Sequence, residues 1–174
     1  REDELVDKVL RELEELLRRV KKRLEDVSRD LERVNREVRD ELRRVSKKVE
    51  DMARRDVGDK ELVDEVRRES EKSNKELEDI SRESKERSDD SNRKLDKLLK
   101  DVRDELRRIR KKVEDGKDAE TVVRDIRRLA EELLRTVDKI VKDNERLARE
   151  SRERVRRIVE RNEELARDLA RKAR

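Results

Sequence analysis

The sequence predicts an all-α protein: an antiparallel, up-down-up bundle of three long helices. Three observations predict this fold. Proline is absent and glycine occurs only twice, so the chain has few helix breakers. The two glycines divide the chain into three parts of similar length, and the apolar residues of each part recur at helical spacing. We therefore expect residues 1–174 to form a single three-helix domain.

The two glycines mark the expected turns. Gly58 and Gly116 are placed to follow a helix C-terminus, where a left-handed backbone costs glycine no steric penalty. Asp59 and Asp118 come shortly afterwards as N-caps, able to accept hydrogen bonds from the free N–H groups of the next helix. Turns this short force consecutive helices to lie antiparallel. The expected helices cover about 2–56, 60–114 and 119–173, with turns near 57–59 and 115–118.

The apolar residues of the first segment follow a repeated set of steps. From Val9 to Met52 they are separated by 4, 3, 4, 4 and 3 residues, and the set then repeats. Five steps cover 18 residues, so the stripe advances 3.6 residues per turn, whereas a heptad repeat advances 3.5. The other two segments fit the same template. We expect nearly straight, untwisted helices.

Serine and asparagine occupy many positions of this template or of the row beside it. A buried hydroxyl or amide without a partner costs about 1 to 3 kcal/mol, so these groups must pair or face water. When the helix ends are paired in antiparallel order, the polar residues fall into three layers, each with a member from every helix. The first layer contains Ser28, Ser88, Ser91, Asn92 and Asn144; the second contains Asn35, Ser81, Ser84 and Ser151; the third contains Ser46, Ser70, Ser73, Asn74 and Asn162.

We interpret these layers as interhelical hydrogen-bond networks. They would fix the register of the helices, because sliding one helix would set donors against Leu or Val. Serine is frequent in the second segment, so incidental or solvated serines are the alternative.

The charge pattern excludes several classes of function. Charged residues make up 60% of the chain, and 54 basic and 50 acidic side chains are mixed along its length. Without a basic face or any aromatic residue, nucleic-acid binding is not expected. Balanced charge and periodic apolar residues favour a folded bundle over a disordered polyampholyte or a single extended helix. The sequence has no membrane-spanning run and no recognisable targeting segment, so we expect a soluble protein and cannot assign a compartment.

The residues that most enzymes and metal sites need are missing. His and Cys are both absent, which removes the usual nucleophile and base pairs and the His-containing metal sites of helical bundles. Carboxylates are abundant, but on charged helix faces they are typical of solvated ion pairs such as Glu4 with Lys8. We expect no enzymatic activity, no cofactor and no metal.

A known class of protein shares three features with the whole chain. These are the 18-residue apolar repeat, the short turns Val57-Gly58-Asp59-Lys60 and Asp115-Gly116-Lys117-Asp118, and surfaces filled with Arg, Lys, Glu and Asp. The chain resembles de novo designed, parametric, untwisted three-helix bundles with buried hydrogen-bond networks, and the resemblance implies no natural activity. The second segment has more serine than we expect of such bundles, which leaves room for looser packing there. Natural three-helix repeats such as spectrin are the competing analogy, but they use a shorter repeat and core aromatic residues.

The predicted function is that of a designed structural scaffold, monomeric and without a required partner. The alternative is a protein-interaction module, either an oligomer subunit or a three-helix receptor for a fourth helix. This alternative is motivated by the weakly apolar centre of the second segment and by a wider apolar stripe on the third. The residues that widen the stripe are Val123, Leu134, Val141, Ala148, Val159, Ala166 and Ala170.

Overall fold

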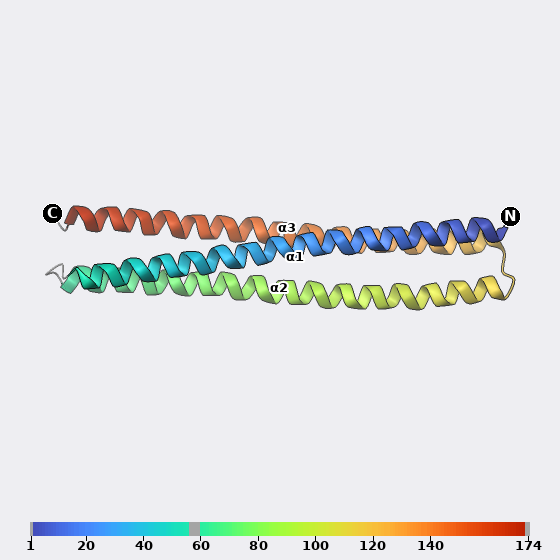
Figure 1. Ribbon diagram of the computed structural model, residues 1–174, viewed down its shortest axis with the longest axis horizontal. Coiled ribbons are helices and arrows are strands. Elements are labelled where there is room, and N and C mark those ends of the chain that lie inside the picture. The colour runs from blue at the N-terminus through green and yellow to red at the C-terminus, as the bar shows by residue number, and fades with distance from the viewer. Residues whose placement is uncertain (1, 56–59, 173–174) are drawn as a thin grey trace. The chain divides into compact units, whose positions relative to one another are not determined.

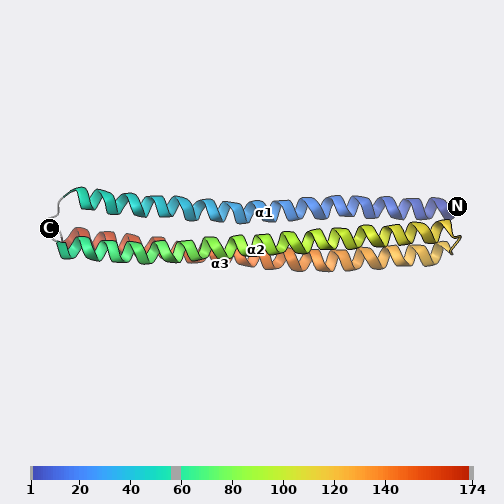
Figure 2. The same ribbon diagram turned by 90° about the horizontal axis from the view of Figure 1, so that it is seen from below.

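The computed structural model describes residues 2–55 and 60–172, and these residues form three helices (Figures 1 and 2). The first helix, α1, spans Glu2–Arg54, α2 spans Lys60–Glu114 and α3 spans Ala119–Lys172. The described residues contain no β-strand. The prediction of an all-α three-helix bundle is confirmed, and the helix ends lie within two residues of the expected positions.

The chain divides into two compact units, and each unit contains one segment of every helix. Unit 1 takes in the described residues of Arg1–Arg29 and Ser88–Glu145, and unit 2 those of Asp30–Arg87 and Arg146–Arg174. Within each unit, α2 therefore runs antiparallel to both α1 and α3, as predicted. A single domain over residues 1–174 and straight helices stay predictions.

Unit 1 is built around one apolar cluster to which all three helices contribute. From α1 and α3 the cluster receives many fully buried side chains, Leu13 and Leu133 among them. The buried residues that α2 contributes to this cluster are Val102 and Ile109. The other apolar residues of α2 that pack against it are only partly buried, namely Leu95, Leu98, Leu106 and Val113.

Unit 2 contains two smaller apolar clusters. In the larger one, Val34 and Val38 of α1 lie among apolar residues of the other two helices, including Leu77 and Ile80 of α2. Full burial of one such side chain contributes about 1.5 to 3 kcal/mol. Between and beside these apolar residues, α2 also buries three serines, Ser70, Ser73 and Ser84.

The end of α2 is a Schellman motif. The N–H of Lys117 donates to the carbonyl oxygen of Lys112 at 3.0 Å, and the N–H of Gly116 donates to that of Val113 at 3.1 Å. Gly116 has a φ of 76°, a left-handed conformation that a side chain with a Cβ rarely adopts. This is the geometry expected of a glycine just past a helix end. The corresponding residues of the other turn, Gly58 and Asp59, lie outside the described residues.

Asp118 caps the first turn of α3. Its Oδ1 accepts a hydrogen bond from the N–H of Glu120 at 3.4 Å, and its carbonyl oxygen accepts one from the N–H of Val122 at 3.1 Å. The side-chain bond satisfies one free N–H group of the helix start, which is the role of an N-cap, and the bond from Val122 is the first regular hydrogen bond of the helix.

Candidate functional site

The strongest candidate site is a pair of polar contacts that join α2 to α3, one in each unit. In unit 1, Ser91 Oγ donates a hydrogen bond to Asn144 Oδ1 at 3.0 Å. In unit 2, Ser73 Oγ donates to Asn162 Oδ1 at 2.9 Å. We call these contacts the unit 1 pair and the unit 2 pair. Ser73 and Asn144 are buried, whereas Ser91 and Asn162 are partly buried.

The unit 2 pair belongs to a longer chain of hydrogen bonds. Arg161 Nη2 donates to Ser73 Oγ at 3.2 Å, so the serine hydroxyl both accepts from Arg161 and donates to Asn162. The two terminal nitrogens of Arg161 also bind the two carboxylate oxygens of Glu76, at 2.8 and 3.3 Å. A bidentate ion pair near the surface thus connects to a buried hydroxyl.

Sequence reasoning missed Arg161 and Glu76 because charged residues fill every helix face. Their signal lies in position: Glu76 is one turn after Ser73, and Arg161 adjoins Asn162. Opposite charges that lie next to a polar layer on two neighbouring helices, at the same level, predict that the hydrogen-bond network of the layer continues to an ion pair.

The second polar layer does not form the hydrogen bonds expected of it. All four of its residues belong to unit 2. Ser84 and Ser151 are buried, and Asn35 and Ser81 are partly buried. However, Asn35 Oδ1 and Ser84 Oγ are both buried without a hydrogen-bond partner. An unpaired buried group costs about 1 to 3 kcal/mol, so this layer destabilises unit 2.

The other predicted network residues have varied surroundings. In the third layer Ser70 is buried and Asn74 is partly buried, and Asn74 Oδ1 has no hydrogen-bond partner. Asn162 Nδ2 and Arg161 Nε are also buried and unpaired, beside the contacts that these side chains do make. In the first layer Ser28 and Ser88 are partly buried.

Two predicted network residues lie on the surface. Ser46 and Asn92 are exposed, so the interior positions expected for them are wrong. Each follows an inward-facing residue, since Val45 is buried and Ser91 forms the unit 1 pair. Successive residues of a helix are separated by about 100° around its axis, so the second residue of each pair turns outward.

A buried carboxylate was also missed by sequence reasoning. Glu41 is 8% exposed, and its Oε1 accepts a hydrogen bond from Nη2 of Arg44 at 2.9 Å. In the sequence, Glu41 stands three residues after Val38 and four before Val45, and both valines are buried. This spacing places Glu41 on the same face of α1 as the valines, which is the signal that identifies it.

Ion pairs add to the contacts between α2 and α3. Lys112 binds Asp125 at 2.8 Å in unit 1, and Arg154 binds Glu83 at 2.9 Å in unit 2. Among the described residues, the ion pairs that join α1 to another helix lie in unit 1, between Arg110 and Glu14 and between Arg23 and Asp138. Within unit 2, the hydrogen bonds and ion pairs between described residues of different helices all join α2 to α3.

On the surface of α3 in unit 2, one cluster of charges has shifted pKa values. A hydrogen bond from Arg156 is the largest cause that lowers the pKa of Glu153, and the charges of Arg156 and Arg157 act in the same direction. Arg156 also bonds Glu160 at 3.1 Å, and its own pKa is raised, chiefly by the hydrogen bond to Glu153.

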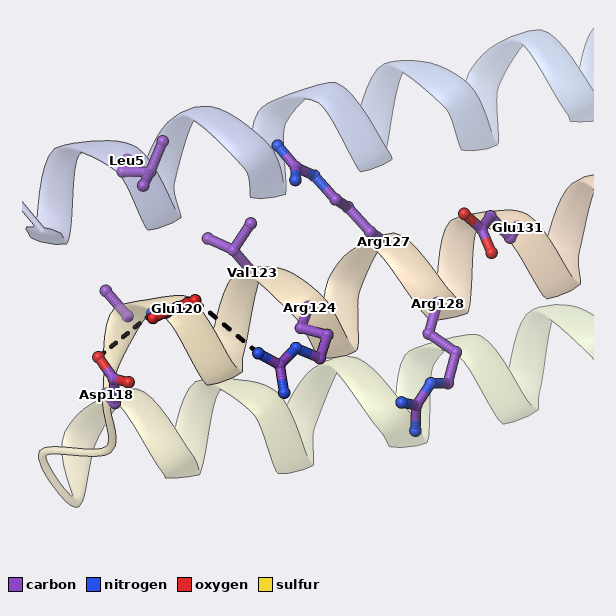
Figure 3. A pocket seen from close by; sticks show the side chains of 9 residues that line it. Leu5, Asp118, Glu120, Val123, Arg124, Arg127, Arg128 and Glu131 are labelled. Carbon is purple, nitrogen blue, oxygen red and sulfur yellow. Dashed lines mark hydrogen bonds and ion pairs between the residues drawn. The ribbon is translucent and has the colours of Figure 1, made fainter.

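Unit 1 has a groove of about 700 Å³ between α1 and the start of α3. Figure 3 shows Leu5 of α1 on the opposite side of it from Val123 of α3, with Arg124 beside Glu120. Leu5 is 46% exposed. The groove is lined by three carboxylates and three guanidinium groups, so its charges balance; these are Asp118, Glu120 and Glu131 with Arg124, Arg127 and Arg128.

A second groove in unit 1, between α2 and α3, has a volume of about 510 Å³. We call it the acidic groove. Its apolar residues are Leu98, Val102, Leu129 and Leu133. Its charged residues are Asp101, Glu105, Asp125 and Glu132, with Lys112 and Arg128. Four carboxylates against two cations leave a net charge of −2.

The wide apolar stripe expected on α3 is largely covered inside the bundle. Val123, Val141 and Ala148 are buried, and Val159 and Ala166 are partly buried. Leu134, at 38%, and Ala170 are exposed. The stripe as predicted is therefore not an open groove for a fourth helix.

Comparisons with protein families, with curated proteins and with solved structures find no match to this chain. Among the described residues, no cluster of three or more potential ligands is arranged to hold a metal ion. No helix in the described part of the chain is both long and apolar enough to cross a membrane.

Proposed function

We propose that the chain is a designed structural scaffold without natural biochemical activity, in which the unit 1 pair and the unit 2 pair set the register of α2 against α3. One observation supports this proposal above the others: in each unit a serine hydroxyl of α2 donates to an asparagine oxygen of α3. A neutral hydrogen bond contributes only about 0.5 to 1.5 kcal/mol net, whereas a buried group left unpaired costs about 1 to 3 kcal/mol. The pairs therefore penalise misalignment more than they stabilise the bundle.

The neighbouring residues of α2 give this penalty a direction. A slide by one turn one way would set Leu77 and Leu95 opposite the two asparagines and leave their oxygens unpaired. A slide the other way would bring Ser70 and Ser88 to those positions, where hydroxyls remain available. The pairs thus oppose sliding in one direction, and apolar packing must oppose it in the other.

The register proposal is tested by measuring a distance between α2 and α3. Spin labels on Glu86→Cys and Arg152→Cys, both exposed in unit 2, report it, and the absence of native cysteine keeps the labelling specific. Replacing the unit 2 pair by Ser73→Ala with Asn162→Leu is expected to add a second distance, displaced by about 5 Å, the pitch of one helical turn.

The matched control is Ser46→Ala, which removes an exposed serine hydroxyl from the same unit. It is expected to keep the single narrow distance of the parent chain. If the single distance persists even when Ser91→Ala with Asn144→Leu removes the unit 1 pair as well, apolar packing alone sets the register and the proposal fails.

A protein-interaction module is the second candidate function. It is supported by the partial exposure of apolar residues in unit 1, where Leu5 is 46% exposed and Leu98 is partly exposed. Light scattering coupled to size exclusion separates the oligomer-subunit form of this candidate from a monomeric scaffold. A mass of 21.1 kDa supports a monomer, and a multiple of it supports an oligomer subunit.

A further inference from the structure

We propose that the acidic groove of unit 1 is a docking site for a basic amphipathic helix of a partner protein. The proposal rests on the second candidate function, the interaction module, and assigns it a site and a class of partner.

The floor of the groove has the properties of a helix-binding surface. Val102 and Leu133 are fully buried at its base, while Leu98 and Leu129 are only partly covered by the bundle. These residues lie on two neighbouring helices, so their side chains form a furrow between α2 and α3. An amphipathic helix binds such a furrow through apolar side chains spaced by three, four and seven residues.

The length of the groove suits several turns of helix. Its lining extends from Leu98 to Lys112 on α2 and from Asp125 to Thr136 on α3. At 1.5 Å per residue, these stretches are roughly 15 to 20 Å long, which corresponds to about three or four turns. The ion pair between Lys112 and Asp125, at 2.8 Å, bridges the two helices at one end of the groove.

The charge of the rim selects the partner. The groove carries a net charge of −2 although the chain as a whole carries +4. The groove between α1 and the start of α3 is neutral by the same count. Asp101 and Glu132 are exposed on the rim of the acidic groove. A helix with Lys or Arg on both sides of its apolar stripe therefore complements this surface, whereas phosphate groups and acidic helices are repelled.

The test is a binding titration with a fluorescein-labelled peptide. The probe has about 18 residues of Leu, Ala and Lys only, long enough for a helix, with Leu along one face and Lys on both sides of it. A second peptide replaces every Lys with Glu. We expect the Lys peptide to bind the parent chain, with an affinity that falls as salt is added, and the Glu peptide not to bind.

A pair of charge-reversal variants locates the site. Asp101→Lys with Glu132→Lys changes the rim, and Asp143→Lys with Glu164→Lys makes the same change of net charge at exposed positions outside the groove. The rim variant is expected to weaken binding of the Lys peptide about tenfold, and the distant variant to leave it unchanged. Circular dichroism checks that both variants remain helical.

Four results would overturn the docking site, and they separate it from the interaction module. If both charge variants weaken binding equally, binding follows net charge and the groove is not the site. If the Glu peptide binds as tightly as the Lys peptide, the rim does not select the partner. If neither peptide binds and the chain has a multiple of its 21.1 kDa mass, a second copy is the partner and the module stands without this site. If neither peptide binds and the chain is monomeric, the docking site and the module both fail.

Discussion

The two halves of α2 show that burial does not follow apolar character. In unit 1 the inner stripe of α2 is rich in leucine, and three of its leucines are only partly buried, namely Leu95, Leu98 and Leu106. In unit 2 the stripe alternates serine with apolar residues, and none of the four at its centre is more than 1% exposed: Ser73, Leu77, Ile80 and Ser84. The more polar half of the helix is the better covered one.

Side-chain size explains this reversal. The distance between packed helices depends on the side chains at the contact, and serine occupies much less room than leucine. We infer that serines allow α2 to approach its neighbours in unit 2, in keeping with the full burial of Leu77 and Ile80, and that the run of leucines in unit 1 leaves side-chain flanks open to solvent. From the many serines of α2 we expected looser packing around that helix. This expectation is wrong for Ser70, Ser73 and Ser84, which are at most 9% exposed.

Close packing in unit 2 is accompanied by imperfect pairing of polar groups. Asn35 Oδ1, Ser84 Oγ and Asn74 Oδ1 are buried there without partners. The two units therefore differ in what limits their stability: incomplete burial of α2 in unit 1, and unpaired polar groups in unit 2.

The largest expected effect on stability comes from removing one leucine from each half of α2. Leu77→Ala in unit 2 is expected to lower the free energy of unfolding by about 3 kcal/mol, because a fully buried leucine leaves a cavity. Leu95→Ala in unit 1 should lower it by only about 1 kcal/mol, because the side chain is already partly hydrated. Urea unfolding of the two variants measures both. Equal losses would show that the two halves of α2 are equally well packed.

Replacing either of two serines of unit 2 by alanine is expected to change the free energy of unfolding by a smaller amount, with opposite signs for the two variants. Ser73→Ala should lower the free energy of unfolding by about 1 kcal/mol, because Asn162 Oδ1 loses its donor. Ser84→Ala should raise it by about 1 kcal/mol, because it removes a buried hydroxyl that has no partner. Both changes gain the same helix propensity, so the difference between them reports the two hydrogen bonds of Ser73 together with the unpaired hydroxyl of Ser84. Thermal unfolding of both variants measures that difference, and a shift of the same sign and size in each would refute the distinction.

The sequence predicted the fold, and it assigned the two residues of the unit 1 pair to one layer and those of the unit 2 pair to another, but it did not predict which atoms meet. The fold follows from the apolar period and from the glycines, which are local features. Pairing the helix ends fixes where Ser91 and Asn144 lie along the bundle axis, and they form a hydrogen bond. It does not fix the rotation of each helix about its own axis. That rotation turns Ser46 and Asn92 outward, whereas a difference of one turn along the axis decides whether Ser88 or Ser91 meets Asn144.

The charged members of the site were harder to predict than its serines and asparagines, for a different reason. With 60% of residues charged, the sequence offers many possible partners for Arg161 or Glu41. Only the packing of the helices leaves Glu41 at 8% exposure and sets Arg161 against Ser73 and Glu76. In the sequence these residues look like any other charged residue of a helix surface, and only their burial in the folded bundle distinguishes them.

The smallest expected effect concerns the surface of unit 2, where packing plays no part. Arg156 donates from Nε and Nη2 to the two carboxylate oxygens of Glu153, and hydrogen bonding by Arg156 is the largest cause that lowers the pKa of Glu153. A carboxyl whose pKa is lower in the folded state stabilises the fold above its unfolded pKa, and this stabilisation is lost as pH falls through the folded pKa. Arg156→Ala should therefore raise the pKa of Glu153 towards its ordinary value, incompletely because Arg157 remains 3.5 Å away. A carboxyl carbon NMR titration measures the shift, with the exposed Arg152→Ala as control. An unchanged pKa in Arg156→Ala would mean that unit 2 gains nothing from this contact, and that its stability depends on the interior alone.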